Sequence, residues 1–182
     1  HLTEEGVAKT EKNFSLKKIS IAEFENIKTE TGIIYELIDG QVVMSRPNIQ
    51  HQRLLTRLSS ELHQHFKNKS CDTYSEIEIK LSEDILVPDI SIICDDTQFT
   101  NQRYNGAPTL IIEILSPSNQ YNDTFIKLNK YEIFGVSEYW IVDPVREIIT
   151  LYNYENKKTL TFSKEETIQS IIFPELAISL SG

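Results

Sequence analysis

Residues 85–93 read ILVPDISII and residues 109–115 read TLIIEIL, and these two stretches decide the fold. Each is a nearly continuous run of Val, Ile and Leu, which is typical of central strands covered on both faces. Helical and strand-like segments alternate around them. The sequence therefore predicts an α/β (or α+β) fold, with a β-sheet flanked by helices.

The flanking segments carry their own signals. Ser20 and Glu23 form a capping box, Asp39-Gly40 is a strong hairpin turn, and a leucine repeat every four residues marks a long amphipathic helix. We expect a helix at 20–28, a hairpin at 32–45, a helix at 48–69, strands at 73–81, 85–93 and 109–115, a helix at 119–134 that Ser118 caps and Gly135 ends, a strand at 138–144 and a C-terminal hairpin at 147–162.

The bulk composition is that of a soluble globular chain, with 182 residues, 40% hydrophobic and 25% charged. We expect residues 1–18 to form a loose N-terminal arm and residues 19–182 a single domain. No apolar run approaches the roughly 20 residues that cross a bilayer. Cys71 and Cys94 show no C-x-x-C spacing, so we expect two buried reduced thiols and a cytoplasmic location. A net charge of −9 disfavours tight binding of nucleic acid by a lone subunit.

Asp89 and Glu113 are charges placed inside the two apolar strands. Burying an isolated carboxylate costs several kcal/mol or more unless it is paired, protonated or bound to a metal. If the strands are neighbours, the two side chains converge and form an oxygen-rich site suited to Mg²⁺ or Mn²⁺. The alternative for each acid alone is a salt bridge or a set of backbone hydrogen bonds.

Lys127 follows in the helix after the Glu113 strand. Asp123, Lys127 and Tyr131 are spaced by four, so they share one helical face that can lie over the strand ends. A lysine there could stabilise charge on a phosphoryl oxygen. The alternative is an Asp123–Lys127 pair at the surface.

Several segments occur in an order that resembles the Uma-type restriction endonuclease family of the PD-(D/E)XK nuclease superfamily. They are YELIDGQVV, HQRLL, VPDISII, IIEILSPSN, a D-x-x-x-K-x-x-x-Y helix and GVSEYWIVDP, and they run from about Tyr35 to Pro144. The resemblance implies a restriction-endonuclease-like core with a magnesium-type site. It assigns the metal-binding acids to Asp89 and Glu113.

The resemblance also implies roles for three further residues. Leu115 stands where the superfamily motif has lysine, so the lysine function moves to Lys127. Glu36 and His51 also match family positions. Glu36 would be a third acid or would orient a water molecule, or alternatively would pair with Arg53 or Arg57. His51 would contact phosphate or water, or alternatively would be a satisfied histidine at a helix start.

The predicted function is a divalent-metal-dependent endonuclease that hydrolyses double-stranded DNA, with Asp89, Glu113, Lys127, Glu36 and His51 at its site. A homodimer is plausible, because two-fold symmetry suits the cutting of two antiparallel strands. One alternative is an inactive module that keeps the fold to bind nucleic acid or protein. A metal-independent hydrolase with two carboxylates is another. Cations without a motif that could contact DNA are Arg53, Arg57, Lys67, Lys69, Arg103 and Lys130.

Overall fold

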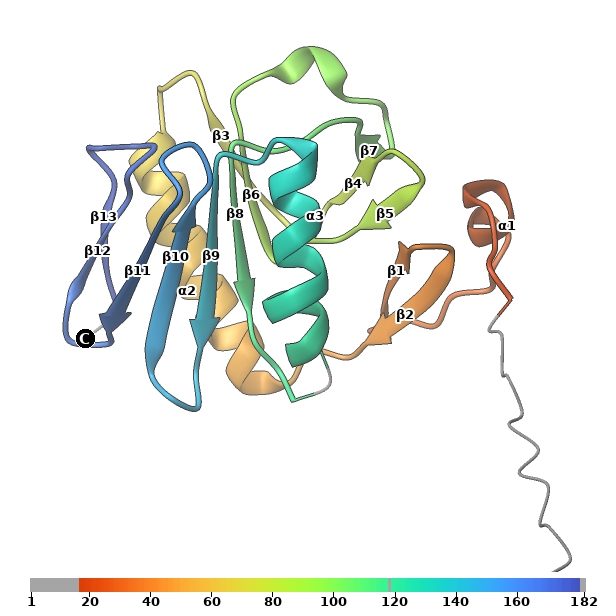
Figure 1. The fold of residues 1–182 in the computed structure, drawn as a ribbon, viewed down its shortest axis with the longest axis horizontal. Coiled ribbons are helices and arrows are strands. Elements are labelled where there is room, and N and C mark those ends of the chain that lie inside the picture. The colour runs from red at the N-terminus through yellow and green to blue at the C-terminus, as the bar shows by residue number, and fades with distance from the viewer. Residues whose placement is uncertain (1–16, 118, 181–182) are drawn as a thin grey trace, which may run out of the picture.

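The computed structural model describes residues 17–117 and 119–180 (Figure 1). Its elements are α1 (Ile21–Glu25), β1 (Ile34–Ile38), β2 (Gln41–Ser45), α2 (Ile49–Phe66), β3 (Asp72–Ser75), β4 (Glu78–Leu81), β5 (Asp84–Leu86), β6 (Ile90–Ile93), η1 (Asp96–Gln98), β7 (Arg103–Tyr104), β8 (Leu110–Ile114), η2 (Asn122–Ile126), α3 (Lys127–Phe134), β9 (Glu138–Asp143), β10 (Ile148–Asn153), β11 (Lys158–Ser163), β12 (Thr167–Gln169) and β13 (Ala177–Ser179).

Two mixed sheets make up most of the molecule. The six-stranded sheet has the order β11-β10-β9-β8-β6-β3, with β8 and β9 parallel and the other neighbours antiparallel. The five-stranded sheet has the order β2-β1-β5-β4-β7, and β12 pairs with β13 separately. Helices α2 and α3 lie on opposite faces of the larger sheet (Figure 1), so the predicted α+β architecture with flanking helices is confirmed.

The two faces of β8 serve two different cores. Ile112 and Ile114 pack with Leu58 and Leu62 of α2, whereas Ile111 packs on the α3 side. Each fully buried aliphatic side chain contributes roughly 1.5–3 kcal/mol through the hydrophobic effect. Because successive strand residues point to opposite faces, Glu113 lies on the α3 side with Ile111.

The helix cap and the hairpin turn that the sequence predicts near the N-terminus lie where the structure has them. Ser20 Oγ accepts the backbone N–H of Glu23, as the capping box predicts. Asp39 and Gly40 both have positive φ, 51° and 76°, which a two-residue type I′ hairpin turn requires. Asn48 caps α2 by accepting the N–H of His51, and Gly135 ends α3 with a φ of 93°. The predicted cap at Ser118 and residues 1–16 of the expected arm lie outside the described residues.

Two expected strands are each divided between the sheets. Segment 73–81 becomes β3 in the larger sheet and β4 in the smaller one, and segment 85–93 becomes β5 and β6 in the same way. Glu76 has a φ of 52° at the first break. Pro88 lies at the second break, where it lacks the N–H that a central strand would donate. The prediction of one continuous strand in each segment was wrong.

The expectation of two reduced thiols was also wrong, because Cys71 and Cys94 form a disulfide. Strands β3 and β6 pair with Asp72 opposite Ile93, so the cysteines that flank this pair face each other, 4.1 Å apart between Cα atoms. The spacing of 23 residues conceals this contact, which arises from strand register. The disulfide removes the basis on which a reducing, cytoplasmic location was expected. Within the two described ranges, no helix has the length and apolar character that crossing a bilayer requires.

Candidate active site

Asp89 and Glu113 meet across two neighbouring strands. Ile90 of β6 pairs with Ile112 of β8 in an antiparallel register, and one further step places Asp89 opposite Glu113. The two residues are only 5% and 2% exposed. Asp89 Oδ2 accepts the backbone N–H of Ile114 at 2.6 Å, which ties this carboxylate to the Glu113 strand. The structure therefore brings the two predicted metal-binding acids together at one point of the sheet.

Lys127 reaches the same point from the helix that follows β8. The turn Asn122–Ile126 is π-helical and leads directly into α3, which begins at Lys127. Turns of π-helix inside α-helices are rare and occur frequently at functional sites. This helix lies against the face of the larger sheet that carries Glu113 (Figure 1). Tyr131, one turn after Lys127, donates its hydroxyl to Glu113 Oε1 at 3.1 Å.

The Lys127 ammonium is shared among three carboxylates. Its Nζ lies 2.9 Å from Glu36 Oε1, 3.3 Å from Glu113 Oε1 and 3.2 Å from Asp123 Oδ1. Burial alone would lower the pKa of Lys127, but the surrounding acids raise it well above its ordinary value. The surrounding acids therefore favour the charged form of Lys127. Glu36 pairs with this lysine and not with Arg53 or Arg57.

Negative charge exceeds positive charge around Lys127. Four buried acids, Glu36, Asp89, Glu113 and Asp123, surround one lysine and one histidine. Burial raises the pKa of Glu113 well above its usual range, Lys127 opposes this shift, and the neighbouring acids add to it. A group of carboxylates this crowded is held ionised only if more positive charge is supplied.

Asp123 is the residue whose environment the sequence predicted least well. Its pairing with Lys127 is as expected, but the pair is fully buried and not at the surface. Apart from the Lys127 ammonium, neither carboxylate oxygen has a hydrogen-bond partner among the described residues. Burial raises the pKa of Asp123 to about 6, against the lowering effect of Lys127. The spacing of Asp123, Lys127 and Tyr131 by four residues predicted that they share one helical face. The sequence did not indicate how deeply this face is buried.

His51 approaches the acids from the first turn of α2. It is 4% exposed, and its Nε2 lies 3.0 Å from Asp89 Oδ1. Burial would lower the pKa of His51, but the hydrogen bond and charge of Asp89, with Glu76 and Asp123, raise it overall. Its Nδ1 is buried and lacks a partner among the described residues. Among the described residues, only one of the two His51 ring nitrogens therefore has a partner.

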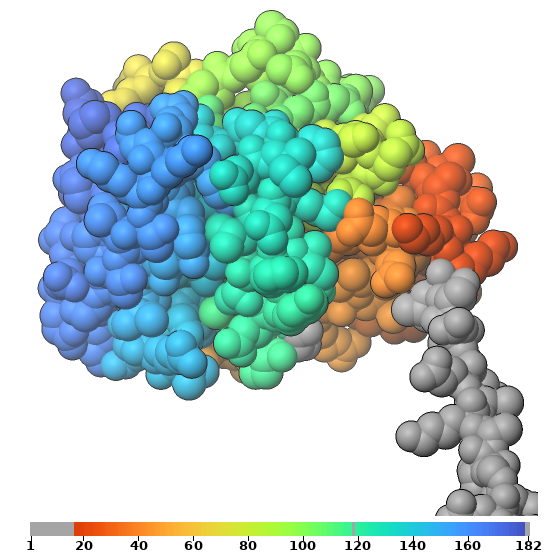
Figure 2. Space-filling view, in the orientation of Figure 1, coloured from red at the N-terminus to blue at the C-terminus, as the bar shows by residue number. Residues whose placement is uncertain are grey.

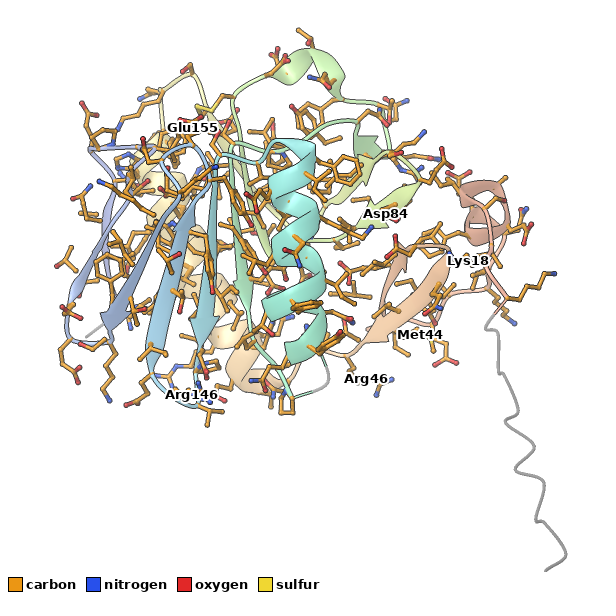
Figure 3. All side chains as sticks on the ribbon, in the orientation of Figure 1. Lys18, Met44, Arg46, Asp84, Arg146 and Glu155 are labelled. Carbon is orange, nitrogen blue, oxygen red and sulfur yellow. A yellow bond between two sulfur atoms is a disulfide. The ribbon has the colours of Figure 1, made fainter. Side chains whose placement is uncertain are left out.

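A small pocket of about 10 Å³, close to the room that a single water molecule needs, lies at the meeting point of β1, α2, β8 and α3. Its lining includes all five predicted site residues: Glu36, His51, Asp89, Glu113 and Lys127. Arg46, an exposed residue that sequence reasoning did not single out, also lines it. Figure 3 places Arg46 next to Met44, at the end of the hairpin strand β2.

A further group of potential ligands overlaps this pocket. One atom each of His51, Glu76 and Asp89 lies within 4.8 Å of the other two, so the three residues could hold a metal ion. Glu76 was not among the predicted site residues. It lies between β3 and β4, in the segment that the sequence predicted as continuous strand.

Two basic residues that could have contacted DNA form salt bridges with acidic residues. Arg103 lies between Glu25 and Glu78, at 2.8 and 2.9 Å, and Lys130 bridges Asp39 and Asp84, at 2.7 and 2.6 Å. In the space-filling view, α3 covers the middle of the face, between the larger sheet and the hairpin β1–β2 (Figure 2). We therefore do not expect Arg103 or Lys130 to hold phosphates.

Comparison with known proteins identifies the family to which this chain belongs. The family described as "Putative restriction endonuclease" (Uma2) matches residues 21–181, which is most of the chain. This chain belongs to that family. The Uma2 match includes every residue of the small pocket, from Ile34 to Lys127.

Two individual proteins are similar to this Uma2 family member. A crystal structure described as "a putative nuclease belonging to DUF820", from Anabaena variabilis, has a TM-score of 0.76 and 21% sequence identity, and the match covers 89% of this chain and 95% of that one. This likeness establishes a shared fold. "Uncharacterized protein slr1290" from Synechocystis is 25% identical over 127 residues, and the match covers 65% of this chain and 65% of that protein.

Proposed function

We propose that this protein is a divalent-metal-dependent endonuclease that hydrolyses DNA phosphodiester bonds. One observation carries the proposal: three buried carboxylates, Glu36, Glu113 and Asp123, share the Lys127 ammonium beside a fourth, Asp89, at a pocket of about 10 Å³. The family match supports nuclease chemistry for this site.

The residues present fit a hard divalent ion. Asp89 and Glu113 would hold it, because carboxylate oxygens are the ligands that Mg²⁺ and Mn²⁺ favour. The unbalanced negative charge around Lys127 is a physical reason for a cation to enter. When bound, such an ion polarises a phosphodiester and lowers the pKa of a bound water molecule.

The chain's other residues hold and neutralise charge around that position. Lys127 would stabilise the negative charge that develops on a phosphoryl oxygen. Glu36 Oε1 lies 2.9 Å from Lys127 Nζ and accepts the backbone N–H of Val87. These two contacts fix the position of the ammonium in the pocket. His51, at 3.0 Å from Asp89, would position an attacking water molecule. Arg46, at the pocket lining, would contact a flanking phosphate.

The alternative is a catalytically inactive module that keeps the fold to bind nucleic acid or protein, and one of the two observations that favoured it no longer does so. It relied on the missing motif lysine at position 115, but Lys127 lies 3.3 Å from Glu113 and can take that role. The acidic net charge still supports it. A homodimer is also part of the proposal, and sedimentation of the purified protein with a duplex tests it.

The test is cleavage of supercoiled and linear DNA with Mn²⁺ or Mg²⁺ by wild type, Glu113→Gln and Glu83→Gln. Glu83 is exposed and serves as a matched acid outside the pocket. We expect Glu113→Gln to lose about 10²–10³-fold in cleavage rate, and Glu83→Gln to match wild type. Equal digestion by all three proteins would assign the activity to a contaminant and remove the proposal.

A further inference from the structure

Three metal-ligating side chains from separate parts of the chain meet beside Asp89. His51 comes from the first turn of α2, Glu76 from the turn between β3 and β4, and Asp89 from the segment before β6. One ligand atom of each lies within 4.8 Å of the other two. Ligands of an octahedral ion stand about 3 Å apart where adjacent and about 4 Å apart where opposite. His51 Nε2 and Asp89 Oδ1, 3.0 Å apart, already have the spacing of adjacent ligands, and the Glu76 carboxylate lies close enough to join them.

His51 is a buried potential metal ligand, and only one of its two ring nitrogens has a partner among the described residues. The residue is 4% exposed, and its Nδ1 lacks a partner among the described residues while Nε2 faces Asp89 at 3.0 Å. A buried histidine usually satisfies both ring nitrogens, since leaving a buried polar atom without a hydrogen bond destabilises the folded protein. The half-satisfied ring lies in the pocket that Asp89 and Glu113 also line.

Glu76 is held beside Asp89 by its backbone. Its φ of 52° is uncommon for a residue other than glycine, and its N–H donates to the Asp89 carbonyl at 3.0 Å. Among the described residues, the side chain makes one long hydrogen bond, from Gln52 Nε2 at 3.4 Å. The carboxylate is therefore anchored by its main chain near Asp89 and remains available to a ligand.

An acidic groove leads to this position. The groove has a volume of about 570 Å³ and is lined by Glu25, Glu30, Glu76 and Glu78, with Arg103 already paired to two of them. It shares Ile34 and Val87 with the small active pocket. A groove with excess negative charge concentrates cations, so a hydrated divalent ion has a route to Glu76.

We propose that His51, Glu76 and Asp89 bind a first-row transition cation, such as Mn²⁺, in preference to Mg²⁺. An imidazole nitrogen suits transition ions, whereas Mg²⁺ prefers oxygen ligands alone. This position is separate from the one proposed between Asp89 and Glu113, although Asp89 borders both. Because Asp89 is a ligand in both proposals, the inference rests on the proposed function.

The experiment measures Mn²⁺ binding by calorimetry and by pulsed electron paramagnetic resonance, which detects nitrogen bound to the ion. The full chain is compared with Glu76→Gln, His51→Gln, Glu113→Gln and the control Glu83→Gln. We expect nitrogen-coupled Mn²⁺ in wild type, Glu113→Gln and Glu83→Gln, with Mg²⁺ a poor competitor. Glu76→Gln should bind that ion about 10–100-fold more weakly, and His51→Gln should lose the nitrogen coupling.

Absence of nitrogen coupling in wild type overturns the inference, and so does a Glu76→Gln protein that binds as wild type does. Circular dichroism identifies a variant that has not folded, and in that case the wild-type spectrum and the His51→Gln variant decide. DNA cleavage, measured in parallel, separates the two proposals. Cleavage without nitrogen-coupled Mn²⁺ removes this inference alone, and nitrogen-coupled Mn²⁺ without cleavage removes the proposed function alone.

Discussion

Glu113 and Glu138 lie on the neighbouring strands β8 and β9, and both are fully buried, yet their surroundings differ. Glu138 accepts five hydrogen bonds from neutral donors and pairs with no cation among the residues that the structure describes. The donors are Trp140, Asn153, Ser170 and the backbone of Ile171 and Ile172. Glu113 accepts the hydroxyl of Tyr131 and shares the ammonium of Lys127 with two other acids.

The difference shows what distinguishes a structural carboxylate from a candidate ligand. Glu138 has its charge dispersed by donors and joins the segment around Ser170 to the sheet. Glu113 stands among like charges, which one lysine cannot balance. A buried acid in an apolar strand is therefore not a site by itself. The surplus of acids over donors is the informative quantity.

Replacing Lys127 should have the largest effect. Lys127→Met leaves Glu36, Glu113 and Asp123 without their shared ammonium, so we expect a loss of about 3–5 kcal/mol in the free energy of unfolding. Urea denaturation measures it, and added Mn²⁺ should restore part of the loss. Lys158→Met, an exposed control, should stay within about 0.5 kcal/mol of wild type. Equal losses in both variants would mean that the shared lysine does not hold the acids.

Glu138→Gln should have a smaller effect of a different kind. The amide turns one acceptor into a donor that faces other donors, so stability should fall by about 2–3 kcal/mol. Cleavage rate and Mn²⁺ affinity should not change, because Glu138 lies outside the pocket lining. A large fall in metal affinity with intact folding would contradict the contrast between the two glutamates.

The pH dependence of stability gives the smallest expected effect. The pKa of Asp123 is raised to about 6 in the folded protein, so folding favours its protonated form. This stabilisation is full below the unfolded pKa and is lost as pH rises through about 6. Without metal, we expect stability to fall by about 1 kcal/mol from about pH 5 to about pH 7. The raised pKa values of Glu113 and His51 act in the same direction.

Asp123→Asn is the matched variant for this pH dependence, since it removes the titrating group and keeps its volume. Its stability should vary less between these two pH values than that of wild type, as measured by urea midpoints in chelator-treated protein. An unchanged slope would show that another group is responsible. Adding Mn²⁺ to wild type should flatten the same profile, because a bound cation favours ionised carboxylates.

The amino-acid sequence by itself determined the main helices, the hairpins and the residues that could share a helical face. Period-four apolar repeats, the Asp39-Gly40 turn and the capping box at Ser20 are local, so their consequences are readable without the fold. The spacing of Asp123, Lys127 and Tyr131 likewise follows from helix geometry alone. These signals act within a few residues of the chain.

Only the tertiary structure decided which of those residues meet. The register of β6 with β8 sets Asp89 opposite Glu113, and the register of β3 with β6 joins Cys71 to Cys94. The division of two expected strands between two sheets moves Glu76 to the edge of the pocket. Strand register and sheet membership depend on the packing of distant segments, and no local period in the sequence encodes them.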